Sequence, residues 1–164
     1  MKKEEKILRI RPFNMANFSG AGGYIPVFAI FGGLVSFPAT LALWSGMASQ
    51  VVNEDGTLNA ALLKRRLARI LLPLGLVSLI LWFAIVIDQI SQYGGNLVGA
   101  MIATVFVVAL HIGGMYISIY FSGKLVSRSG QLTKGKWFLL TLTFSIMMLI
   151  VGIIAPIFLF AIAI

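Results

Sequence analysis

Apolar and polar positions along this chain are segregated into long blocks. Four apolar blocks cover residues 24–49, 70–90, 97–121 and 137–164. The hydrocarbon core of a bilayer is about 30 Å thick and is crossed by about 20 apolar residues of helix. Lipid offers no partner for a free backbone amide, so each block should be a helix. The pattern therefore predicts an all-α integral membrane protein built as a four-helix transmembrane bundle.

Composition agrees with this class, because 59% of the 164 residues are hydrophobic and only 11% are charged. Soluble domains average about 25% charged residues. A chain of this length is one domain. We divide it into a basic N-terminal segment, residues 1–23, and a transmembrane helical domain, residues 24–164. The first segment is expected to form a loop or an interfacial helix, and it lacks the apolar stretch of a cleaved secretory signal.

Two glycines and a proline lie near the middle of the first apolar block, at Gly32, Gly33 and Pro38. Proline removes one intrahelical hydrogen bond and kinks a helix. Two forms are compatible with this pattern: a kinked helix that still crosses the membrane, or a re-entrant hairpin that returns to the side from which it came. We favour the kinked, complete helix, because the basic residues later in the chain are enough to set the orientation.

Basic residues distinguish the two sides of the predicted bundle. The connection 91–96 has no Lys or Arg, whereas the connections before the second block and after the third have four each. The positive-inside rule therefore places residues 91–96 and the C-terminus outside, and the two basic connections in the cytoplasm. Four complete crossings would also place the basic N-terminus outside, which conflicts with the rule. We expect the protein in the cytoplasmic membrane of a prokaryote.

Four basic residues just before the second block are predicted to lie at the membrane interface: Lys64, Arg65, Arg66 and Arg69. Each such residue near anionic headgroups contributes about 1 kcal/mol of attraction. The expected partners are therefore the bilayer and its anionic lipid headgroups. The net charge of +8 does not indicate nucleic acid, since the aromatic residues lie mainly in the apolar blocks and no basic surface with interleaved rings results.

His111 is the only histidine and falls near the middle of the third block. An ionisable residue at that depth is a candidate functional residue, and Met115 follows on the same helical face. Such a pair suits haem iron or copper, so both are candidate cofactor ligands, with haem b as the possible cofactor. We favour a neutral His111 hydrogen-bonded to a neighbouring helix, with no cofactor. Metal or haem ligation and proton handling are the alternatives.

Small residues four apart predict a packing face on the third block. They are Gly99 and Ala103, then Ala109 and Gly113, with Gly114 beside them. This spacing allows two helix backbones to approach closely. We interpret it as a helix–helix seam, because a pore would need a continuous polar lining.

The chain has no cysteine and no specific catalytic motif. We therefore expect a protein that is not an enzyme: a subunit, an assembly factor or a small transport component that acts through helix packing, as a homo-oligomer or with other membrane subunits. The alternative is a redox membrane subunit that binds haem, copper or quinone through His111. A lipid-handling enzyme ranks last, because it would ordinarily need acids or histidines at the headgroup boundary.

Overall fold

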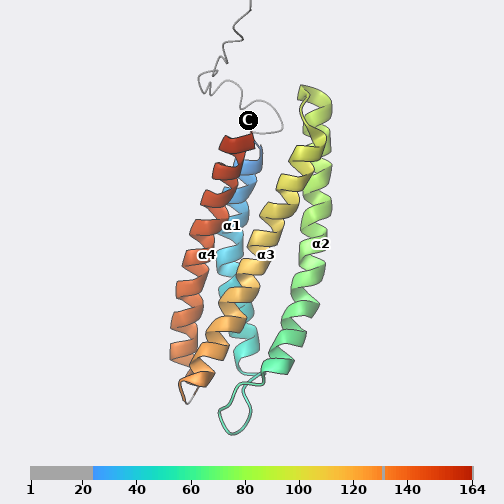
Figure 1. Cartoon of the computed structure of the whole chain (residues 1–164). Coiled ribbons are helices and arrows are strands. Elements are labelled where there is room, and N and C mark those ends of the chain that lie inside the picture. The colour runs from blue at the N-terminus through green and yellow to red at the C-terminus, as the bar shows by residue number, and fades with distance from the viewer. Residues whose placement is uncertain (1–23, 131, 164) are drawn as a thin grey trace, which may run out of the picture.

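A computed structural model of the chain describes residues 24–130 and 132–163. Its helices are α1 (Tyr24–Ala48), α2 (Ala60–Tyr93), α3 (Leu97–Arg128) and α4 (Lys134–Ala163). They run alternately up and down in one all-α bundle (Figure 1). All four are long and apolar enough to cross a membrane. The predicted fold class, a bundle of four such helices, is confirmed.

The first helix is complete. It continues without a break through Gly32, Gly33 and Pro38, and it runs from one end of the bundle to the other (Figure 1). Two hydroxyl groups that flank the proline bond to the backbone before it: Ser36 Oγ donates to the Gly33 carbonyl at 3.0 Å, and Thr40 Oγ1 donates to the Ser36 carbonyl at 2.7 Å. Of the two predicted forms, the structure has the complete helix and not the re-entrant hairpin.

The other helices are longer than the apolar blocks. Residues 60–69 continue directly into the second block and form with it one helix of 34 residues, α2, which continues through Pro73. Asn59 caps its start, because the Asn59 side chain accepts a hydrogen bond from the Leu62 amide at 3.0 Å. The third helix ends at Arg128. Hydropathy marks only the part of a helix that lies in hydrocarbon, whereas lysine and arginine are good helix formers that extend it beyond the lipid boundary.

The packing is uneven. Helix α3 contacts both α2 and α4, and α1 packs against α3 and α4. Helix α2 is therefore held mainly by α3, and α1 and α2 make little contact with one another. One buried cluster near the basic end joins all four helices and includes Met47, Leu67, Ile119 and Trp137. Because α1 and α2 make little contact, a space remains between these two helices.

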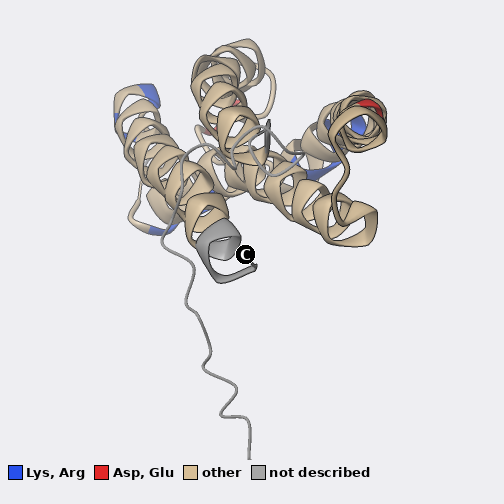
Figure 2. Ribbon diagram, turned by 90° about the horizontal axis from the view of Figure 1, so that it is seen from above, with Lys and Arg blue, Asp and Glu red and all other residues tan. Residues whose placement is uncertain are grey.

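The outer surface of the bundle is apolar. On α2, for example, Leu72, Leu76 and Ile80 are each more than 60% exposed. Most of the helical ribbon is tan, and charged residues occupy only short stretches of it (Figure 2). The basic residues at the start of α2, the end of α3 and the start of α4 lie at one end of the bundle (Figure 1). Outward apolar side chains, with basic residues gathered at one end, are the distribution that a bilayer favours.

Candidate functional site

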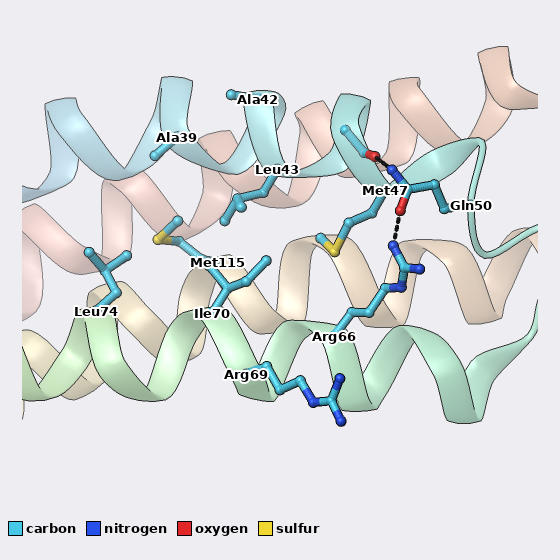
Figure 3. A pocket seen from close by; sticks show the side chains of 11 residues that line it. Ala39, Ala42, Leu43, Met47, Gln50, Arg66, Arg69, Ile70, Leu74 and Met115 are labelled. Atoms are coloured by element: carbon cyan, nitrogen blue, oxygen red, sulfur yellow. Dashed lines mark hydrogen bonds between the residues drawn. The ribbon is translucent and has the colours of Figure 1, made fainter.

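An open groove runs between α1 and α2, in the half of the bundle that carries the basic residues (Figure 3). Its volume is about 710 Å³, within the range of roughly 300–1,000 Å³ that is usual for small-molecule sites. Most of its lining is apolar, and the polar members lie together at one end. The lining residues are Ala39, Ala42, Leu43, Gly46, Met47, Gln50, Arg66, Arg69, Ile70, Leu74 and Met115.

Small side chains on α1 create the groove. Ala39, Ala42 and Gly46 recur at helical spacing and so form one stripe that lines it. A Cβ atom added at Gly46 would meet no other atom within 4 Å, so the space in front of this position is open. Helix α2 does not close the space, because it packs on α3. Met115, which is buried on α3, contributes to the lining from that helix.

A relay of hydrogen bonds holds one arginine at the polar end of the groove. Gln50 Nε2 donates to the carbonyl of Gly46, one turn earlier on α1, at 2.9 Å. Gln50 Oε1 accepts a hydrogen bond from the guanidinium group of Arg66 on α2 (Figure 3). Arg69 follows Arg66 by one turn and is exposed. Both guanidinium groups therefore lie at the mouth, and one of them is tied across it from α2 to α1.

The described part of the chain has three carboxylates, Glu54, Asp55 and Asp88, and none of them lines the groove. In the α1–α2 connection, Asp55 Oδ1 accepts hydrogen bonds from the hydroxyl of Thr57 at 2.6 Å and from its backbone N–H at 2.9 Å. These bonds, the hydroxyl bond first, hold the pKa of Asp55 below its ordinary value. The mouth of the groove thus has two cationic side chains and no anionic one among its lining residues.

Of the four basic residues predicted to lie at the membrane interface, two line the groove and two do not. Arg66 and Arg69 belong to the groove, whereas Lys64 and Arg65 are exposed on the same helix and are not part of its lining. The sequence pattern does not distinguish these pairs. The difference arises from the direction in which each side chain leaves the helix.

His111 lies in a space that three glycines leave on the neighbouring helices. Its side chain is only 8% exposed. A Cβ atom would lie 2.8 Å from the imidazole Cε1 if added at Gly32, 3.6 Å from Nε2 at Gly33, and 3.3 Å from Nε2 at Gly152. The ring of Phe28 meets the imidazole edge-on, with 6.0 Å between centroids. Glycine at these positions therefore makes room for the imidazole between α1, α3 and α4.

Hydrogen bonding satisfies His111 incompletely. The backbone groups of Ala29 on α1 and of Val107 on α3 lie beside the imidazole, but Nε2 is buried and has no hydrogen-bond partner within the described ranges. Met115, the second candidate ligand, lines the groove on the side of α1 and α2. The two candidate ligands are one turn apart on α3 and have different neighbours.

Two of the five predicted packing positions lie against other helices. Gly114 is buried, and a Cβ atom added there would be 3.1 Å from the Cβ of Met148 on α4. Ala103 is half-buried and packs against a cluster that contains Ile25 and Phe28 of α1. Helices α3 and α4 thus come close together at Gly114.

The other three positions have more open surroundings. A Cβ atom added at Gly113 would meet nothing within 4 Å, and at Gly99 it would meet only the side chain of Asn96, which caps the same helix. Ala109 is exposed. Within the single chain that the structure describes, these three positions are open to contact with lipid or with another chain.

The polar part of the α3–α4 interface was not predicted from the sequence. Trp137 is fully buried, and its Nε1 donates to the carbonyl of Ile119 at 3.3 Å. The indole fits because Gly123 has no side chain: a Cβ atom there would lie 3.0 Å from the ring. Next to it, the hydroxyl groups of Ser122 and Thr141 are 2.8 Å apart and hydrogen-bonded.

Comparisons with known proteins leave the site to be interpreted from its geometry. No protein-family model, curated protein or solved structure matches this chain.

Proposed function

We propose that this chain is an integral membrane protein whose basic end lies in the cytoplasm. The observation that carries the proposal is the distribution of side chains: apolar side chains are exposed along the helices, and eight Lys and Arg lie at one end of the bundle (Figure 1). Exposure of these apolar side chains to water would cost free energy, whereas contact with lipid hydrocarbon does not. Complete crossings by all four helices then place the 91–96 connection, the C-terminus and the start of α1 outside.

Within the membrane, we propose that the protein acts by binding and not by catalysis. The groove between α1 and α2 has the volume of a ligand site, and its polar groups are guanidinium and amide groups, which bind anions but are poor general bases or nucleophiles. In the described residues, no three His, Cys, Asp or Glu side chains come together where they could hold a metal ion. A subunit, assembly factor or small transport component fits this arrangement.

Fractionation of cells that express the chain tests membrane insertion. After the membranes are washed with alkaline carbonate, which strips peripheral proteins, the chain should remain in the pellet. It should enter the soluble fraction only when detergent is added. Release by carbonate alone would contradict insertion.

A redox subunit that uses His111 is the second candidate, because Nε2 of this residue is buried and unpartnered in the described structure. An imidazole nitrogen free of protein partners is what an axial haem ligand requires. The packing of the ring against Gly32 and Gly152 favours a structural role instead. We expect the purified protein to show no Soret band, and a Soret band that disappears in the His111→Gln variant would favour the redox subunit.

A further inference from the structure

We propose that the groove between α1 and α2 binds an acyl chain of an anionic phospholipid from the surrounding bilayer, with the lipid phosphate at Arg66 and Arg69. This inference rests on the membrane insertion proposed above. It is based on the lining of one groove, which is apolar along most of its length and has two cationic side chains at its polar end (Figure 3). A phospholipid has the same two parts in the same order.

The length of the groove fits one leaflet. Its lining extends from Ala39 on α1 to Gln50, just past the end of this helix, and these 11 residue steps correspond to about 16 Å at the helical rise. The hydrocarbon core is about 30 Å thick, so one leaflet contributes about 15 Å. An acyl chain that runs from the arginines along Ala42 and Leu43 to Leu74 would therefore end near the middle of the bilayer.

The groove is also accessible from the lipid. Helices α1 and α2 barely touch, and the lining residues Ala42, Gly46, Ile70 and Leu74 are exposed at the surface of the bundle. A bilayer lipid can thus enter sideways between the two helices, without leaving the membrane. A soluble anion could bind the two arginines but would leave the apolar part of the groove empty.

The headgroup, not the chain, must determine the selectivity of such a site. An acyl chain is in hydrocarbon both before and after binding, so its transfer into the groove gains little. The phosphate, by contrast, meets two guanidinium groups, whose planar donors match phosphate oxygens in pairs. Arg66 is held in place by Gln50, and no carboxylate lines the groove to compete. A zwitterionic headgroup carries the same phosphate but adds a quaternary ammonium, which the two guanidinium groups repel, so anionic lipids should be preferred to zwitterionic lipids with identical chains.

Native mass spectrometry of the detergent-purified protein tests this preference. The protein is titrated with phosphatidylglycerol or phosphatidylcholine of identical acyl chains, and the ratio of the two apparent affinities for the first bound lipid is measured. Wild type should prefer phosphatidylglycerol. R66Q and R69Q should each lower the ratio, by about fivefold, as expected for loss of one cation near an anionic headgroup.

R65Q is the matched control, because Arg65 is adjacent in sequence and exposed but does not line the groove. It should leave the ratio unchanged. An equal loss in R65Q, R66Q and R69Q would show a diffuse basic collar and would overturn the site. No preference in wild type would also overturn the lipid site, yet it would leave membrane insertion intact, since the carbonate wash measures insertion separately.

Filling the groove supplies a second, charge-independent test. The Gly46→Leu variant projects a side chain into open space and improves helix propensity, so it should fold and lose the first bound phosphatidylglycerol. Gly113→Leu is the control, since Gly113 also faces open space but lies outside the groove, and it should retain the lipid. Retention of the lipid by Gly46→Leu would overturn the proposal. If the wild type is a dimer and Gly46→Leu becomes a monomer that still binds the lipid, the proposal is also overturned, and the groove is assigned to a second copy of the chain.

Discussion

At the scale of single residues, two adjacent glycines of α3 have opposite surroundings. Gly114 is buried against Met148 of α4, whereas Gly113 faces open space. Their sequence spacing does not reveal this difference. In a soluble helix the polar face would fix which glycine points inward, but a membrane helix is apolar on all sides, so the pattern predicts a small-residue stripe without its direction.

Replacing each of these glycines with leucine tests the close approach. Gly114→Leu should lower the free energy of unfolding by about 1–3 kcal/mol, because the new side chain cannot avoid Met148 and overpacking forces the helices apart. Gly113→Leu should change it little. Unfolding by SDS titration, followed by the loss of helical circular dichroism, measures both. Equal destabilisation by the two variants would contradict the packing described above.

His111 shows the same limit of sequence reasoning. Its depth in the third block could be predicted, and so could its burial, because an ionisable side chain avoids lipid. The three glycines around it, Gly32, Gly33 and Gly152, come from helices that are distant in the sequence. In the sequence, Gly32 and Gly33 suggest a kink or a break in α1, whereas in the structure they make room for the imidazole.

At the scale of elements, the α3–α4 interface combines close approach with hydrogen bonds. Its polar residues have a sequence signal that could have been used: Ser118 and Ser122 are four apart on α3, and Thr141 and Ser145 are four apart on α4. All four are buried. A hydroxyl ladder on two apolar helices is typical of an interhelical contact. Which hydroxyl groups meet depends on the register of the two helices, which the sequence does not reveal.

A double-mutant cycle on Ser122→Ala and Thr141→Val measures this contact. The coupling free energy between the two sites should be about 0.6 kcal/mol, and not more than about 1.7 kcal/mol, which are the average and the maximum for side-chain hydrogen bonds between the helices of a membrane protein. Thr143→Val is the control partner, because Thr143 is exposed and bonds to the carbonyl of Leu139 in its own helix. Coupling of Ser122 to Thr143 as strong as to Thr141 would refute the interhelical bond.

At the scale of the whole molecule, the number and class of the helices could be predicted, whereas the groove could not. Helices follow from local hydropathy and from the cost of free backbone groups in lipid. The groove depends on which helices are neighbours. Helix α2 packs on α3 and makes little contact with α1, and no local property of the α2 sequence predicts this choice of neighbour. Its members Arg66 and Arg69 were predicted as interface residues, but their position beside Ala42 and Gly46 was not.

The orientation that we propose for the bundle rests on the same arrangement. Complete crossings place the start of α1 at the same end as the 91–96 connection (Figure 1), so the predicted conflict between the basic N-terminus and the positive-inside rule remains. We resolve it in favour of the later basic residues, because eight Lys and Arg lie at the opposite end. This proposed orientation would place the groove mouth in the cytoplasmic leaflet, where anionic lipids are enriched.

Labelling of single cysteines tests the membrane-spanning bundle and its orientation most directly. The chain has no native cysteine, so Gln92→Cys and Ser129→Cys each provide one thiol, at an exposed position near opposite ends of the bundle. A membrane-impermeant maleimide applied to intact cells should label residue 92, and it should label residue 129 only after the membrane is permeabilised. Labelling of residue 129 alone in intact cells would invert the orientation, and equal labelling of both in intact cells would contradict a bundle that separates the two ends across the membrane.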